Sequence, residues 1–211
     1  MNPEEWRTYL VTQESLSAGR STLEVVEAAI DGGVDVVQLR EKETSARWRY
    51  ELGQEVCDLA AGTDVDVLVN DRVDIAQAVA ADGVHLGSAD LPVSVARELL
   101  GPDAIIGYST ADPAEARQAQ EAGADYLGVG AVYGTDSKDV DDPKDGIGLE
   151  QVSAVAEAVD VPVIGIGGVT ADNAASVREA GATGVAVISE ITAADDPKAA
   201  TAALCEGVTH D

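Results

Sequence analysis

Short runs of aliphatic and β-branched residues recur along the 211-residue chain, separated by longer segments with helical spacing. Most of the runs are continuously hydrophobic rather than alternating, which is typical of parallel strands that helices cover from outside. We predict eight strands: TYLVT (8–12), VVQLR (36–40), DVLVN (66–70), GVHLG (83–87), AIIGYS (104–109), YLGVGAV (126–132), PVIGIGG (162–168) and GVAVIS (184–189).

The segments between the runs are rich in Ala, Glu and Val and carry helix-start signals. Ser21 and Glu24 have the spacing of a capping box, in which two side chains satisfy N–H groups of the first helical turn. Asp112 and Pro113 suit the N-cap and first position of a later helix. Strands that alternate with helices indicate an α/β fold, either a doubly wound open sheet or a closed (β/α)8 TIM barrel.

The number of predicted strands favours one of these two architectures. A (β/α)8 barrel has eight strands, and no GxGxxG turn follows the first strand, as it does in many open nucleotide-binding sheets. No linker, low-complexity stretch or change of composition divides the chain. We therefore predict a single (β/α)8 barrel domain over residues 1–211.

Polar residues collect where the predicted strands end. In VVQLREKE (36–43), Gln38, Arg40 and Lys42 occupy alternate positions, which face the same side of a strand. An amide, a guanidinium and an ammonium on one side suit a phosphate, which the fork of Arg40 can bind through two hydrogen bonds. The alternative for Lys42 is a scattered surface lysine. Because barrels bind ligands at the carboxyl ends of their strands, we favour an anion site.

Lysine is rare in this chain, with four residues in 211, and two of them lie in a long polar segment after the sixth predicted strand. This segment, GTDSKDVDDPKDG (134–146), contains Lys138 and is longer than most connections between a strand and a helix. Long connections of this kind are often functional. We expect Lys138 to add a cation to the anion site, against the alternative of an ordinary surface lysine.

Two aspartates follow the third and fourth predicted strands. Asp71 lies in LVNDR and Asp90 lies in HLGSADLP. Mg²⁺ typically binds one or two carboxylates together with substrate phosphate oxygens. The sequence therefore indicates a Mg²⁺ site at Asp71 and Asp90, although the pattern alone leaves open that both are helix N-caps or turn residues.

The last two predicted strands indicate a second phosphate site. GIGGV (165–169) precedes a predicted helix, and glycines allow a phosphate to approach the backbone closely. ISE (188–190) follows the eighth strand. Because the loops after strands seven and eight often bind phosphate in barrels, we expect an anionic group between these two segments.

Acidic residues dominate the charge. Asp and Glu number 39 against 13 Lys and Arg, which gives a net charge of −26. Such a surface repels nucleic acid and anionic membranes, so neither is an expected partner. Because about 1 M salt shortens the Debye length to about 3 Å and screens self-repulsion, the acidic, halophile-like surface predicts a salt-rich cell interior.

The cysteines and the N-terminal sequence bear on the cellular compartment, and His85 and Ser109 have structural interpretations. Cys57 and Cys205 are the only cysteines and indicate neither a disulfide framework nor a metal cluster. No secretory signal and no run of about 18 apolar residues is present, so we expect a cytoplasmic protein. We interpret His85 as a packed or hydrogen-bonded strand residue. Ser109 is not a candidate nucleophile, because the spacing places no histidine beside it.

Several of these segments together resemble the thiamine-phosphate synthase family. They are, in order, VVQLREK, VNDRVDIA, ADGVHLGSADLP, IIGYST, AGADYLGVGAVYGTDSK, IGIGGVT and AGATGVAVIS. The likeness extends from YLVT near the start to Asp196–Pro197, which is nearly the whole chain. The resemblance implies a (β/α)8 barrel and a Mg²⁺-dependent transferase of thiamine biosynthesis. Its small-molecule substrates would be 4-amino-5-hydroxymethyl-2-methylpyrimidine diphosphate and 4-methyl-5-(2-phosphoethyl)thiazole, carboxylated or not.

The resemblance also implies roles for individual residues. Asp71 and Asp90 would hold Mg²⁺, and Arg40, Lys42 and Lys138 would act as catalytic cations on the leaving pyrophosphate. The pyrimidine diphosphate would contact Gln38, Leu39, Arg40, Glu41, Lys42, Asn70, Ser109 and Lys138, although the parity of Leu39 and Glu41 places their side chains on the opposite face. The thiazole phosphate would contact Thr135, Asp136, Ser137, Gly168, Ile188 and Ser189.

The chain departs from the family pattern at two places. The family often has STH where this chain has Ser109, Thr110 and Ala111, so a histidine near the site is missing. The family loop is often PTxTK, whereas here Asp136 adds a negative charge and Ser137 keeps a hydroxyl. These changes concern the thiazole loop and its neighbourhood more than the reaction.

Two other functions are alternatives to the synthase. A thiazole tautomerase of the same superfamily should lack the full diphosphate and Mg²⁺ set, which this chain retains at Lys42, Asn70, Asp71, Asp90 and Lys138. A non-catalytic sensor of a phosphate ligand would have no reason to keep a pyrophosphate site beside a second phosphate site. The oligomeric state, including a homo-oligomer, is left open by the sequence.

Overall fold

Eight parallel strands form a closed barrel in the computed structural model, which describes residues 2–42, 44–134 and 146–209. Each strand pairs with its sequence neighbours, and β8 returns to pair with β1, so the predicted TIM barrel is confirmed. The strands are β1 (Thr8–Val11), β2 (Val36–Leu39), β3 (Asp66–Asn70), β4 (Gly83–Leu86), β5 (Ile105–Ser109), β6 (Tyr126–Gly130), β7 (Val163–Ile166) and β8 (Gly184–Val187).

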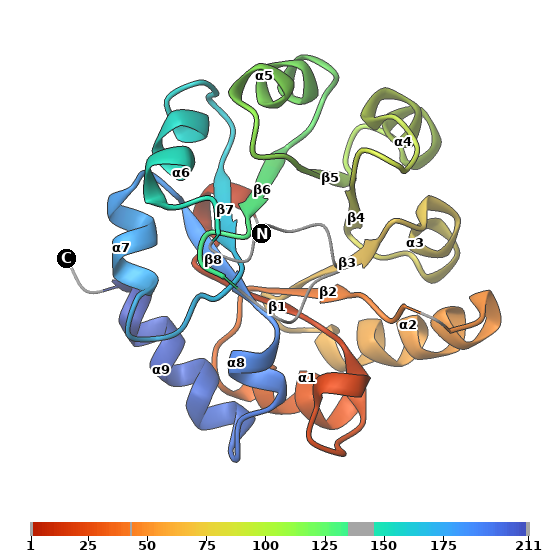
Figure 1. The fold of residues 1–211 in the computed structure, drawn as a ribbon. Helices are drawn as coiled ribbons and strands as arrows, with labels where there is room; N and C mark the ends of the chain where they lie inside the picture. Colours follow the sequence, from red (N-terminus) through yellow and green to blue (C-terminus); the bar gives the residue numbers. More distant parts are fainter. Residues whose placement is uncertain (1, 43, 135–145, 210–211) are drawn as a thin grey trace.

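Helices follow the strands and surround the barrel (Figure 1). The Ser21 hydroxyl accepts from the N–H of Glu24 and the Glu24 carboxylate accepts from the N–H of Ser21, which confirms the predicted capping box. Asp112 caps the helix that begins at Pro113, as predicted. The helices are α1 (Thr22–Asp31), α2 (Ala46–Ala60), α3 (Val73–Val79), α4 (Val93–Leu100), α5 (Pro113–Glu121), α6 (Leu149–Ala156), α7 (Ala174–Glu179), α8 (Ser189–Thr192) and α9 (Pro197–Thr209), with 3-10 turns at Pro3–Glu5 and Glu14–Leu16.

Strand parity divides the core into two layers. Val37, Val67 and Val69 point outward into the large apolar layer beneath the helices. Tyr9, Tyr126 and other inward side chains fill the inside of the barrel. This inner cluster consists of Trp6, Tyr9, Val11, Val36, Leu68, Tyr126, Ile164, Ala186 and Ile188. Because side chains fill its interior, the barrel has a packed core and not a pore.

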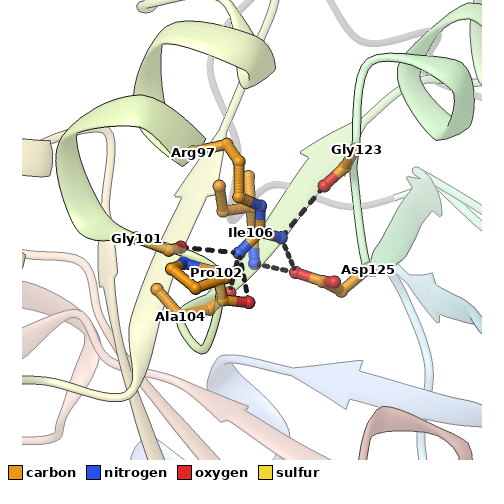
Figure 2. Close-up of polar contacts among 7 residues, drawn as sticks. All are labelled: Arg97, Gly101, Pro102, Ala104, Ile106, Gly123 and Asp125. Atoms are coloured by element: carbon orange, nitrogen blue, oxygen red, sulfur yellow. Dashed lines mark hydrogen bonds and ion pairs between the residues drawn. The ribbon is translucent and has the colours of Figure 1, made fainter.

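An arginine on α4 ties the amino ends of β5 and β6 together (Figure 2). Arg97 donates to the carbonyls of Gly101, Ala104 and Gly123 and forms an ion pair with Asp125, with 2.6 Å between Nη2 and Oδ2. The same Asp125 oxygen accepts from the backbone N–H of Ile106 at 2.6 Å. This network lies at the end of the barrel opposite to the predicted site, where residues serve stability.

In the part of the chain that the structure describes, no helix has the length and apolar character needed to cross a membrane.

Candidate active site

A cavity of about 460 Å³ lies at the carboxyl ends of the strands, and all eight strands or the residues that follow them contribute to its wall. This is the position at which barrel enzymes carry their active sites. Its lining residues are Tyr9, Val11, Gln38, Arg40, Lys42, Asn70, Asp71, His85, Gly87, Ser88, Ser109, Thr110, Ala111, Tyr126, Gly128, Gly130, Ile164, Ile166, Ala186 and Ile188.

One side of the cavity is cationic. Gln38, Arg40 and Lys42 all line it, as their alternation along the chain predicts. The segment that follows β1 holds Arg40 in place: the Arg40 N–H donates to Thr12 Oγ1 at 3.1 Å, and Arg40 Nη1 donates to Oε1 of Gln13 at 2.7 Å. The guanidinium is therefore positioned before any ligand arrives, which lowers the entropy cost of binding an anion.

Two residues of the same segment have their side chains elsewhere. Leu39 is buried in the outer apolar layer. Glu41 is buried beneath α1, where its carboxylate accepts from the Thr22 hydroxyl at 2.8 Å and from the Glu14 N–H at 3.0 Å. Neither residue lines the cavity. The side chains of Leu39 and Glu41 therefore lie away from the cavity, and their substrate contacts stay a prediction.

Two carboxylates meet beside the cationic side. Asp71 follows β3 and lines the cavity, and its side chain interacts electrostatically with that of Asp90. Burial and the charge of Asp90 raise the pKa of Asp71 to about 6, against the opposing effect of Lys42 and Arg40. Asp71 also has a left-handed φ of 62°, a conformation that aspartate tolerates better than most residues and that often marks functional sites.

This pair fits the donor set of Mg²⁺. The two carboxylates repel each other, which raises the pKa of Asp71. A divalent cation between them would remove this repulsion and stabilise both in the charged form. The Gly87 N–H donates to Asp90 Oδ2 at 2.7 Å and so orients that carboxylate. Among the described residues, no group of three or more His, Cys, Asp or Glu side chains could hold a metal. Mg²⁺ bound by one or two carboxylates usually takes further oxygens from water and substrate phosphates.

The floor of the cavity holds a histidine that the sequence spacing does not predict. His85 Nε2 lies 2.7 Å from Ser109 Oγ, so the expectation of no histidine beside Ser109 is wrong. Strands β4 and β5 are neighbours, and their register brings the two side chains together. The interpretation of His85 as a hydrogen-bonded strand residue is confirmed, and His85 also lines the cavity. Asn70 completes this side of the wall.

Two buried tyrosines were also missed by sequence reasoning. Tyr9 and Tyr126 line the bottom of the cavity, and their hydroxyl oxygens are 2.9 Å apart. Burial raises the pKa of both above the ordinary value of tyrosine, so both hydroxyls keep their protons. One sequence signal points to them. The chain has no Phe, so an aromatic ring in the barrel interior always comes with a polar group.

A second, smaller cavity of about 90 Å³ adjoins the first one. Gly168, Ile188 and Ser189 line it, so three residues predicted for the second phosphate site lie together. Ile166, Ala186 and Ile188 line both cavities, which makes the two sites neighbours. Asn173 holds the glycine loop, because its Nδ2 donates to the Gly168 carbonyl at 3.1 Å.

The remaining predicted site residues belong to the long polar segment. Thr135, Asp136, Ser137 and Lys138 lie outside the described residues. Ala111, which stands where the thiamine-phosphate synthase family often has a histidine, lines the large cavity.

Comparisons with known proteins identify relatives over almost the full chain. A family model described as thiamine monophosphate synthase matches residues 8–191. The chain is 61% identical over 205 residues to the thiamine-phosphate synthase of Haloarcula marismortui, and the match covers 97% of both chains. It is 50% identical over 206 residues to the thiamine-phosphate synthase of Moorella thermoacetica, covering 98% of this chain and 97% of that relative.

A solved structure shows the same likeness in three dimensions. The thiamine phosphate pyrophosphorylase from Pyrococcus furiosus superimposes with a TM-score of 0.88 at 39% sequence identity. The superposition covers 98% of this chain and 96% of that chain.

Proposed function

This chain belongs to the thiamine monophosphate synthase family, and we propose that its large cavity joins a pyrimidine diphosphate to a thiazole phosphate. The observation that carries the proposal is that two cations, Arg40 and Lys42, line the same cavity as Asp71. Both cations lower the pKa of Asp71, and the neighbouring Asp90 raises it, so the four charged groups lie close enough to interact. A diphosphate needs cations and a metal site side by side, and a simple monophosphate sensor does not.

The proposed reaction is a substitution at the methylene carbon of the pyrimidine. The bond between this carbon and the diphosphate oxygen breaks, and its electron pair leaves with pyrophosphate. The electron-rich aminopyrimidine stabilises the resulting cation, and the lone pair of the thiazole nitrogen forms the new C–N bond. The products are thiamine monophosphate and pyrophosphate. No protein nucleophile is required, so the contributions of the protein are positioning and charge neutralisation.

The residues have separate roles in this proposal. Arg40 and Lys42, with Lys138 from the long polar segment, bind the diphosphate and offset the charge that grows on the leaving pyrophosphate. Asp71 and Asp90 would hold Mg²⁺, which when bound supplies further positive charge to the diphosphate.

The two rings occupy different parts of the site. The pyrimidine contacts Gln38, Asn70 and Ser109 in the large cavity. The phosphate of the thiazole binds in the small cavity near Gly168, Ile188 and Ser189, together with Thr135, Asp136 and Ser137. Because the two cavities share lining residues, the thiazole would bind beside the pyrimidine.

The acidic surface sets conditions for this activity. A net charge of −26 repels two anionic substrates, and the cationic side of the cavity offsets this repulsion locally. We propose that the protein acts on small molecules in the cytoplasm of a cell with a salt-rich interior.

A direct assay tests the proposal. The purified chain in molar KCl with Mg²⁺ and both substrates should form thiamine monophosphate and release pyrophosphate in equal amounts. Reactions that lack either substrate are the control, because pyrophosphate release without the thiazole phosphate would indicate hydrolysis instead of coupling. No coupled product over a range of KCl and Mg²⁺ concentrations would overturn the proposal.

A further inference from the structure

Five side chains form a continuous line of hydrogen bonds across the floor of the large cavity, which we call the Gln38–Ser109 relay. Gln38 Nε2 donates to the Tyr9 hydroxyl at 2.6 Å, and the Tyr9 and Tyr126 hydroxyl oxygens are 2.9 Å apart. Tyr126 Oη lies 2.7 Å from His85 Nδ1, and His85 Nε2 lies 2.7 Å from Ser109 Oγ. The relay joins β2, β1, β6, β4 and β5.

The relay has one direction in which every hydrogen has an acceptor. Because Gln38 Nε2 can only donate, Tyr9 accepts from it and keeps its own O–H for Tyr126. Tyr126 then donates to His85 Nδ1. If Tyr126 donated to Tyr9 instead, the Tyr9 hydrogen would lack an acceptor among the described residues, at a site where Tyr9 is only 2% exposed. A buried hydroxyl without a partner costs about 1–3 kcal/mol.

This direction fixes the histidine tautomer and the serine hydroxyl. When His85 Nδ1 accepts, the neutral ring carries its hydrogen on Nε2 and donates it to Ser109 Oγ. The Ser109 hydrogen then points to the cavity, which Ser109 lines. At the other end, Gln38 Oε1 accepts no hydrogen bond from the described residues, and Gln38 also lines the cavity. The relay therefore presents a donor at Ser109 and an acceptor at Gln38.

Two glycines make room for the relay. A Cβ at Gly107 would meet Tyr126 Oη at 2.4 Å, and a Cβ at Gly128 would meet His85 Cε1 at 3.0 Å. Gly107 lies between β4 and β6 in the barrel, paired with His85 on one side and Tyr126 on the other. The missing side chain lets the Tyr126 ring pass over β5 to reach His85. The two glycines therefore leave the space in which Tyr126 and His85 form their hydrogen bond.

We propose that the Gln38–Ser109 relay sets the polarity of the cavity floor and selects a ring that offers an acceptor nitrogen to Ser109 and an amino donor to Gln38. The identity of this ring as an aminopyrimidine rests on the proposed function. In this account Tyr9, Tyr126 and His85 are positioning residues, which act on the ligand through Gln38 and Ser109. The corresponding 4-oxo ring, which replaces the amino donor by an acceptor and carries N–H in place of an acceptor nitrogen, has the wrong polarity and is rejected.

The first experiment measures this selectivity. We compare the kcat/KM for the 4-aminopyrimidine diphosphate with that for its 4-oxo analogue, and expect the wild type to prefer the amino compound by about a hundredfold or more. Tyr126→Phe, which cuts the relay, should lower this preference at least about tenfold and raise the KM of the aminopyrimidine, with the KM of the thiazole phosphate unchanged. An unaltered preference in Tyr126→Phe would overturn the proposal.

Matched variants separate polarity from simple damage. Tyr108→Phe removes a hydroxyl that donates to Glu115 at 2.7 Å on the same strand as Ser109, but outside the relay, so its preference should equal that of the wild type. His85→Gln keeps a donor for Ser109, whereas His85→Leu does not. Gln should therefore preserve the preference better than Leu, and equal loss in both variants would contradict a role for the donated hydrogen.

The second experiment needs no activity, and its readout comes from the wild type. The chain has two histidines, His85 and His210, so the ring ¹⁵N signals can be assigned with one His210→Asn variant. We expect His85 in the wild type to be neutral with its hydrogen on Nε2 at pH 7.5. An Nδ1–H tautomer or an imidazolium would overturn the relay direction. Failure of the proposed function, by contrast, would appear as absence of product from the wild type with the aminopyrimidine.

Discussion

The guanidinium of Arg40 donates a hydrogen bond from Nη1 to Oε1 of Gln13, with 2.7 Å between the two atoms. Gln13 follows β1 and Arg40 follows β2, so the contact joins two neighbouring strand ends at the cavity mouth. Gln13 itself does not line the cavity, so its effect on a ligand passes through Arg40.

Removing this partner should weaken diphosphate binding. We expect Gln13→Ala to raise the KM for the pyrimidine diphosphate about fivefold, because a hydrogen bond to a charged group contributes about 1 kcal/mol or more. Gln77→Ala is the control, since Gln77 on α3 donates to the Leu99 carbonyl at 3.0 Å away from the cavity. Equal KM values in the wild type and Gln13→Ala would show that Arg40 needs no such support.

Asp71 should make the metal-free protein more stable at low pH. Burial and Asp90 raise its pKa to about 6, whereas an aspartate in an unfolded chain has a pKa of about 3.9. The folded state therefore binds this proton more tightly, so the contribution favours folding below about pH 4 and is lost as the pH rises through about 6. Asp71→Asn should remove this contribution from the melting temperature measured in EDTA.

Asp74 gives a control of opposite sign for this measurement. The ion pair with Arg72, 2.5 Å between Nη2 and Oδ2, lowers the pKa of Asp74, so its contribution is lost as the pH falls. The pH profiles of Asp71→Asn and Asp74→Asn should therefore deviate from the wild type in opposite directions. Deviations of the same sign would contradict the assignment of the raised pKa to Asp71.

Magnesium binding should follow the protonation of the same carboxylate. At pH 5 most Asp71 side chains carry a proton that Mg²⁺ must displace, whereas at pH 7.5 most do not. We expect the Mg²⁺-induced rise in melting temperature to be larger at pH 7.5, and to disappear in Asp71→Asn but not in Asp74→Asn. A rise of the same size at both pH values would argue against Asp71 as a ligand.

The Arg97 network should support the fold without affecting the chemistry. Arg97→Ala removes the guanidinium from Asp125 and from four backbone carbonyls, so we expect a loss of about 3 kcal/mol in the free energy of unfolding. Lys198→Ala, which removes an exposed ion pair with Asp31, should cost less than about 1 kcal/mol. Urea denaturation at fixed KCl measures both, and equal losses would mean that the network contributes no more than a surface pair.

High salt should stabilise the protein. With a net charge of −26, self-repulsion opposes the folded state until ions screen it. The melting temperature should therefore rise steadily between low and molar KCl, and NaCl at equal ionic strength should act similarly if screening is the cause. Equal stability at low and molar salt would count against adaptation to a salt-rich interior.

Much of the fold could be predicted because each strand is a hydrophobic run that can be recognised from its own residues alone. The eight hydrophobic runs became the eight strands, with ends that differ by only a few residues from those predicted. Parity along one strand correctly placed Gln38, Arg40 and Lys42 at the cavity, with the side chains of Leu39 and Glu41 on the other side.

Contacts between strands could not be predicted in the same way. The pairing of His85 with Ser109 depends on the register of β4 and β5, and the pairing of Tyr9 with Tyr126 on two strands that meet across the barrel interior. No spacing in the sequence encodes these distances. The absence of Phe was a usable hint, since it implies that ring hydroxyls inside the barrel have a purpose.

The central claim is that the cationic residues and the aspartate pair at the barrel mouth drive departure of pyrophosphate. Turnover with both substrates, Mg²⁺ and molar KCl tests it most directly when the wild type is compared with Asp71→Asn and Lys138→Ala. The account predicts one pyrophosphate per thiamine monophosphate in the wild type. In each variant turnover should be at least about tenfold lower, a loss of about 1.4 kcal/mol in transition-state stabilisation. Unchanged turnover in both variants would contradict it.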